Sequence, residues 1–176
     1  MHNASVMGAC GSAGLQLYSY GRTVSIPFFT DAWRPTSFYP KMKYNYDGGM
    51  HTLCLLDIKV REEDFVLLAK TGKTSYLPPR YMTVNQALEQ LIESEDIEKG
   101  GVVTMDDTLV VGMARLGHVD QVIRAGSVRE LMEVDFGAPL HCLVVAAKET
   151  TELEVEAMKP YFVEGSTMLT RKWAAF

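Results

Sequence analysis

Apolar segments rich in β-branched residues alternate along this chain with segments that carry helix signals. The expected strands lie at 23–29, 51–58, 108–116, 121–125 and 140–146, and the expected helices begin near residues 5, 37, 83, 127 and 151. Strands that alternate with helices imply a single sheet covered by helices. A short turn joins the strands at 108–116 and 121–125, so these two predict a hairpin. We therefore predict an α/β fold with one mixed β-sheet of about five strands.

Three of the expected helices begin at capping boxes, in which a Ser or Thr and a Glu or Gln three residues later bond each other's backbone. The pairs are Thr83 with Gln86, Ser127 with Glu130 and Thr151 with Glu154. Between the second and third expected strands, apolar residues at 84, 87, 88, 91 and 92 have helical spacing and predict one buried stripe. The nearly continuous apolar run 51–58 predicts a strand buried on both faces, whereas Pro27 indicates an edge strand or a bulge.

The chain opens on a segment built mainly from Gly and Ala. It predicts a helix that Asn3 or Ser5 caps and that ends near Gly21. Gly costs a helix interior about 1 kcal/mol relative to Ala and is tolerated where a backbone or a ligand comes close. The unpaired N–H groups at the helix start carry partial positive charge beside Ser5. We therefore expect one wall of a polar-ligand site here, with the opposite wall outside this chain.

Composition and charge narrow the functional classes. The net charge is −5, from 17 basic and 22 acidic side chains without a basic patch, and this argues against direct nucleic-acid binding. The chain has no run of about 18 apolar residues and no signal peptide, so no membrane span is expected. Cys10, Cys54 and Cys142 have apolar neighbours and no C-x-x-C spacing, which indicates buried reduced thiols and a cytosolic setting.

Catalytic motifs are scarce. The sequence has no P-loop, no H-E-x-x-H motif and no G-x-S-x-G elbow. Its four histidines, at positions 2, 51, 118 and 141, lie far apart, and we expect no metal site. Arg115 and Asp57 are expected to form internal ion pairs, whereas Arg34 and Arg80 are candidates for meeting an acidic group of a substrate.

Several separated sequence blocks nevertheless resemble one protein family, and they follow one another in the same order as in that family. They are 2–9, 14–18, 23–26, 30–31, 33–35, 51–59, 78–87, 111–115 and 134–141. Through these blocks, residues 2 to 162 resemble the C-terminal half of the diphthine synthases, also called diphthine methyl ester synthases. This family belongs to the tetrapyrrole methylase-like class. Ordered blocks of this kind are more specific than any single short motif.

The resemblance implies an S-adenosylmethionine-dependent methyltransferase of diphthamide biosynthesis, with S-adenosylhomocysteine as product. Its substrate would be the modified histidine of translation elongation factor 2, on which the eukaryotic form trimethylates the amino group and esterifies the carboxylate. The resemblance also implies a cytoplasmic homodimer, for which Leu15, Leu17 and Tyr18 would offer an apolar helix face. A sulfonium methyl donor is already activated, so catalysis by positioning would leave few motifs.

The family binds its cofactor between two domains, and five positions of this chain match its cofactor contacts. They are Ser5, Val6, Leu56, Leu116 and His141. Taken alone, Ser5 would be a helix cap, Leu56 a core residue and His141 a hydrogen-bonded core histidine. The resemblance favours cofactor contact at each of them, proton transfer by His141 is the less favoured role, and no catalytic residue is assigned.

The resemblance assigns residues 1–163 to a C-terminal methyltransferase domain and 164–176 to a tail expected to be mobile. The N-terminal domain of the family, with its Gly-rich loop and acidic cofactor contact, has no counterpart here. The turn 117–120 also replaces a more acidic one. We therefore expect the chain by itself to be inactive. Two alternatives stay open: a non-catalytic domain that folds and dimerises without cofactor, and a tetrapyrrole methylase-like enzyme with another substrate, such as a corrin precursor.

Overall fold

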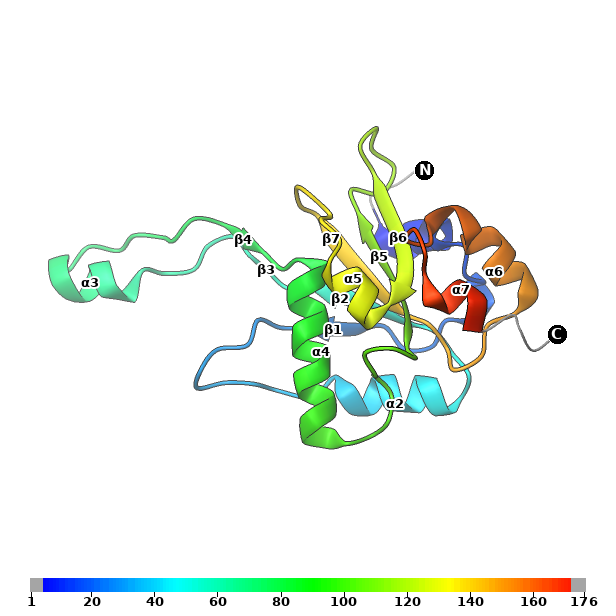
Figure 1. Ribbon diagram of the computed structural model, residues 1–176. Helices are drawn as coiled ribbons and strands as arrows, with labels where there is room; N and C mark the ends of the chain where they lie inside the picture. The colour runs from blue at the N-terminus through cyan, green and yellow to red at the C-terminus, as the bar shows by residue number, and fades with distance from the viewer. Residues whose placement is uncertain (1–4, 172–176) are drawn as a thin grey trace.

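A computed structural model describes residues 5–171, in which five strands form one mixed sheet in the order β1-β2-β7-β5-β6 (Figure 1). The strands are β1 (Val24–Ile26), β2 (Thr52–Leu56), β5 (Leu109–Ala114), β6 (Val122–Ser127) and β7 (His141–Val145). β1 runs parallel to β2, and the other three pairs are antiparallel. This confirms the predicted α/β fold, the hairpin formed by β5 and β6, and the edge position of the strand that precedes Pro27.

The strand register brings three strand ends to the same end of the sheet. Ala114, the last residue of β5, pairs with His141, the first residue of β7. On the other side of β7, Leu55 of β2 pairs with Cys142. The C-terminal ends of β2 and β5 therefore lie beside the N-terminal end of β7, and strand ends are the places where α/β sheets form ligand sites.

Helices cover both faces of the sheet (Figure 1). On one face, α2 (Tyr39–Asp47), α4 (Val84–Glu98) and α5 (Val128–Met132) contribute to a core with Ile26, Cys54 and Leu143. On the other face, α6 (Glu152–Met158), α7 (Thr167–Arg171) and the segment 10–15 pack against Leu53 and Val144. All three predicted capping boxes are present at the starts of α4, α5 and α6. Within residues 5–171, no helix is both long enough and apolar enough to cross a bilayer.

The first helix is much shorter than predicted. α1 (Val6–Ala9) ends after four residues, and short 3-10 turns follow at Cys10–Ala13 and Leu17–Ser19. Gly14 ends the first of these 3-10 turns with a left-handed φ of 84°, and a Cβ at this position would lie 3.0 Å from the carbonyl carbon of Ala157 in α6. The glycine therefore permits a close approach between two backbones. The predicted alternative cap, Asn3, lies outside the described residues.

Leu15, Leu17 and Tyr18 do not form the exposed helix face that was expected from the sequence. Leu15 is 3% exposed and belongs to the core. Leu17 and Tyr18 remain exposed in a short 3-10 turn.

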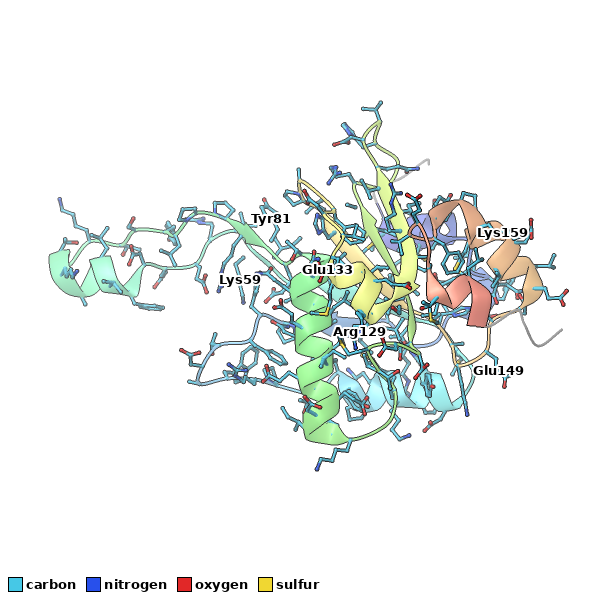
Figure 2. All side chains as sticks on the ribbon, viewed as in Figure 1. Lys59, Tyr81, Arg129, Glu133, Glu149 and Lys159 are labelled. Atoms are coloured by element: carbon cyan, nitrogen blue, oxygen red, sulfur yellow. The ribbon has the colours of Figure 1, made fainter. Side chains whose placement is uncertain are left out.

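An arm projects from the body of the molecule between β2 and α4 (Figure 1). It consists of β3 (Ile58–Lys59), α3 (Phe65–Thr71) and β4 (Arg80–Tyr81), and β3 pairs antiparallel with β4. Figure 2 labels Lys59 and Tyr81 at its base. None of β3, α3 and β4 is among the elements expected from the sequence.

The division into a domain at 1–163 and a tail at 164–176 stays a prediction. In the described part of that tail, the Ser166 hydroxyl donates to Glu130 Oε2 at 2.7 Å, and the backbone N–H of Thr167 donates to Glu130 Oε1 at 2.8 Å. Met168 is buried against the second core. This part of the chain is therefore packed against α5 and the sheet.

Candidate functional site

A cavity of about 530 Å³ lies where β2 and β5 end and β7 begins. Its lining residues are Ser5, Val6, Ala9, Leu55, Leu56, Ile58, Arg115, Leu116, Leu140, His141 and Cys142. The five residues predicted as cofactor contacts all belong to this set, although they come from four separate parts of the sequence. The lining is mainly apolar, with Ser5, Arg115 and His141 as polar members, and the volume falls in the ordinary range of small-molecule pockets.

Ser5 and Val6 reach the cavity from α1. The carbonyl of Ser5 accepts hydrogen bonds from the N–H groups of Gly8 at 3.1 Å and Ala9 at 3.2 Å. Ser5 is the N-cap residue of α1, as expected, but its side chain makes no capping hydrogen bond. A single turn also aligns too few peptide dipoles to supply the positive end expected from a full helix. The contribution of α1 is therefore a close backbone wall with small side chains.

His141 is held by backbone groups on both ring nitrogens. Its Nε2 lies 3.1 Å from the carbonyl oxygens of Gly137 and Ala138, and its Nδ1 lies 3.3 Å from the N–H of Val84. These partners require an Nε2–H donor and an Nδ1 acceptor, which is the neutral ring. The imidazole is therefore fixed as part of the cavity wall, and this geometry does not favour a proton-transfer role.

Arg115 positions Leu116 at the mouth of the cavity. Its Nε donates to Asp120 Oδ2 at 2.8 Å, and its Nη1 donates to the carbonyl of Phe136 at 2.9 Å and to that of Ala138. The backbone of Arg115 has a φ of 49°, which turns the chain sharply at the end of β5. These bonds join the β5–β6 turn to the loop before β7. They confirm the predicted internal ion pair of Arg115.

Asp57 also bonds internally. Its Oδ2 accepts from the N–H of Phe28 at 3.1 Å and lies 3.5 Å from Lys59 Nζ. The carboxylate therefore holds the segment after β1 against the end of β2, as the predicted internal pairing requires.

A second cavity, of about 350 Å³, lies beside the first. Ile58 lines the first cavity, and its pairing partner across β3 and β4, Tyr81, lines the second. Both arginines predicted as candidates for a substrate contact line this second cavity. Arg34 pairs with Glu93 at 2.6 Å, and Arg80 pairs with Glu62 at 3.0 Å. The guanidinium of Arg80 also lies 4.5 Å from the ring centroid of Phe28.

A buried pair of His51 and Glu154 was not predicted. Nε2 of His51 lies 2.9 Å from Glu154 Oε1, and Nδ1 accepts from the N–H of Ala147 at 2.9 Å. Burial raises the pKa of the Glu154 carboxyl, but the donors at Thr151, Gln16 and His51 outweigh it, and the net effect lowers that pKa. The capping box identified Glu154, but no sequence signal joined it to a histidine 103 residues away. Residues 5–171 contain no cluster of three or more metal-binding side chains.

The mixed sheet, its helices and the cavity at the strand ends define an α/β domain with a small-molecule pocket. No family model matches the chain. The chain is 58% identical over 161 residues to an Arabidopsis thaliana protein named a probable diphthine methyl ester synthase. It is 48% identical over 166 residues to the diphthine methyl ester synthase of Homo sapiens. The chain is thus a homologue of the diphthine methyl ester synthases.

These two matches cover 92% and 93% of this chain but 57% and 58% of the relatives. The chain therefore spans a little more than half the length of the curated relatives it matches. A crystal structure from Entamoeba histolytica, assigned as a diphthine synthase, superposes with a TM-score of 0.81 at 46% identity. That superposition covers 93% of this chain and 59% of the other.

Proposed function

We propose that this chain supplies one wall of the S-adenosylmethionine pocket of a methyltransferase in diphthamide biosynthesis. The observation that carries the proposal is that Ser5, Val6, Leu56, Leu116 and His141 line one cavity. The resemblance to the diphthine synthases implies the same five residues as cofactor contacts. The reaction is inferred from the names of the homologues. The location of the cavity at the strand ends supports the proposed cofactor site.

The lining of the cavity suits a nucleoside with a thioether or sulfonium group. Leu56, Leu116 and Val6 offer apolar contact area for the purine and the methylene groups. Ser5 and Arg115 are polar groups at the same cavity, where they can orient the ligand. When bound, S-adenosylmethionine supplies an activated methyl group. The residues of this chain hold it, orient it and exclude water, and positioning of this kind is a large part of such catalysis.

The substrate in this proposal is the modified histidine of translation elongation factor 2. The protein is cytoplasmic in this proposal and acts as a homodimer, and neither a membrane nor a nucleic acid is a partner. Arg34 and Arg80 line the second cavity, where they are the cationic groups that an acidic group of the substrate would meet. Methylation of elongation factor 2, but not of a corrin precursor, separates this function from that of a tetrapyrrole methylase.

Calorimetry with S-adenosylhomocysteine tests the pocket without requiring catalysis. We expect this chain to bind it with a dissociation constant on the order of micromolar. Heat that stays at the level of dilution when the ligand reaches about a thousand times that concentration would contradict the proposal. The result would then favour the alternative of a non-catalytic domain that folds and dimerises.

The substitution Leu116→Glu is expected to weaken S-adenosylhomocysteine binding at least tenfold, which corresponds to about 1.4 kcal/mol. The new carboxylate would stand in the apolar wall and would lose hydration when the ligand covers it. Val119→Glu is the matched control, because Val119 lies in the same hairpin turn and is 98% exposed. Calorimetry on both variants, with circular dichroism to verify folding, checks this. Equal affinities for the two variants would exclude Leu116 from the pocket.

A further inference from the structure

The guanidinium of Arg115 connects two segments that line the first cavity, which lies at the strand ends. These segments are the β5–β6 turn, which carries Leu116, and the loop before β7 (Figure 1). Nε and Nη2 of Arg115 donate to the side chain of Asp120 at 2.8 Å and to its carbonyl at 3.0 Å. Nη1 donates to the carbonyl of Phe136 at 2.9 Å and to that of Ala138. The guanidinium therefore bonds the turn on one side and the loop on the other.

These bonds leave Arg115 with little capacity to hold a ligand directly. A guanidinium has five N–H donors, and four of them bond to groups within residues 5–171. The remaining donor can contact a ligand, but it cannot form the paired bonds with which arginine holds a carboxylate. The main role of this side chain is therefore to fix other parts of the cavity wall.

Arg115 also fixes the loop that carries His141. The backbone N–H of Arg115 donates to the carbonyl of Leu140 at 2.9 Å. The carbonyl of Ala138 accepts from Arg115 and lies 3.1 Å from Nε2 of His141, so the two side chains share one acceptor. Three carbonyls of the loop, at positions 136, 138 and 140, thus accept from Arg115.

We propose that Arg115 is a positioning residue that fixes Leu116 and His141 relative to each other, so that the cavity is formed before a ligand binds. This inference rests on the proposed cofactor pocket and explains how its wall is held. The φ of 49° at Arg115 supports it, because a residue other than glycine keeps a left-handed backbone only where its surroundings hold it there. A pocket formed in advance binds more tightly, since its walls need no ordering when the ligand arrives.

Arg115→Lys tests the inference in the chain as it stands. Lys keeps a positive charge beside Asp120, but its single ammonium group cannot replace the planar fork that joins the turn and the loop. We expect the dissociation constant of S-adenosylhomocysteine to rise at least tenfold in calorimetry. Arg129→Lys is the matched control and should leave the affinity unchanged. Arg129 forms a paired contact with Asp106, at 2.7 and 3.1 Å, and does not line the cavity.

Hydrogen–deuterium exchange distinguishes positioning from a general loss of structure. In Arg115→Lys without ligand, the backbone N–H groups of the turn 116–121 and the loop 136–140 should exchange faster than in the parent. Those of β2 and α4 should exchange at the parent rate, and S-adenosylhomocysteine should slow exchange in the turn and the loop again. Faster exchange throughout the chain, with a lower melting temperature, would assign Arg115 a general structural role and overturn the inference.

A double-mutant cycle tests the link through Ala138. His141→Phe removes the ring N–H that shares this carbonyl with Arg115, and circular dichroism verifies that each variant folds. Combining His141→Phe with Arg115→Lys should raise the dissociation constant by less than the product of the two single effects, because both substitutions loosen the same loop.

The outcomes separate this inference from the proposed function. An affinity that Arg115→Lys does not change, or single effects that multiply in the double variant, would overturn the inference and leave the proposed pocket standing. A parent chain that does not bind S-adenosylhomocysteine would overturn the pocket and the inference together.

Discussion

Replacing Glu154 with alanine is expected to lower the free energy of unfolding by about 2–3 kcal/mol, because hydrogen-bond donors around the buried carboxylate then lose their acceptor. Glu154 is 5% exposed and accepts hydrogen bonds from His51 and from the N–H groups of Gln16 and Thr151. Without the carboxylate, the buried ring of His51 loses its partner, and the N–H groups of Gln16 and Thr151 lose their acceptor. Urea denaturation measures the change, and Glu152→Ala is the matched control because Glu152 is an exposed residue of the same helix.

The loss of stability caused by Glu154→Ala should become smaller at low pH. The pKa of Glu154 is lowered in the folded state from its ordinary value of 4.5. A carboxyl of this kind stabilises the fold above the pKa of the unfolded chain, and the contribution disappears as the pH falls through the folded pKa. The difference between the parent and Glu154→Ala should therefore be largest near pH 7 and shrink below about pH 4.5. If the difference in unfolding free energy between the parent and Glu154→Ala is the same at pH 3 as at pH 7, the charge of the carboxylate does not contribute to stability.

Gly112→Val is expected to be the second strongly destabilising substitution, with a loss of about 3 kcal/mol from overpacking. A Cβ at Gly112 would lie 2.3 Å from Cζ of Phe136 and 3.1 Å from Cγ1 of Val84. Phe136 is 1% exposed and has no free space to move into. Thermal unfolding measures the loss. Substituting Phe136→Leu together with Gly112→Ala should recover part of the stability that Gly112→Ala loses alone, because neighbouring changes in a core are coupled.

Substitution of Gly112 also links the stability of the fold to the candidate pocket. The carbonyl of Phe136 accepts from Arg115, and its ring lies 5.9 Å from the ring of His141. A displaced Phe136 would disturb both side chains at the cavity. Calorimetry of Gly112→Ala should thus show weaker S-adenosylhomocysteine binding even where the protein remains folded. Unchanged affinity in a destabilised Gly112→Ala would separate the strand packing from the pocket.

Much of the fold could be predicted because its signals are local. The capping boxes at Thr83, Ser127 and Thr151 depend on bonds between residues three apart, and all three form as expected. Apolar runs rich in β-branched residues also located the five strands to within a few residues. The first helix was predicted too long, because the sequence from Cys10 to Ala13 forms a 3-10 turn that the left-handed Gly14 ends, and at Gly14 the chain lies close to α6, far along the sequence.

Local sequence patterns could not predict the candidate site or the arm. Leu56 looks like any core residue, and only the resemblance to a family set it apart. The convergence of Leu56, Leu116 and His141 depends on strand order, which periodicity does not fix. α3 was missed because none of its residues is buried in the described chain, and its apolar run lacks the polar face that marks an ordinary surface helix.

The three free thiols have a practical consequence for labelling. Cys10, Cys54 and Cys142 are buried, and burial raises the pKa of the Cys142 thiol to about 12. Maleimides and iodoacetamide react with the thiolate, so the natural cysteines should modify slowly while the protein is folded. A cysteine introduced on α3 would then take a fluorophore selectively, without a cysteine-free background.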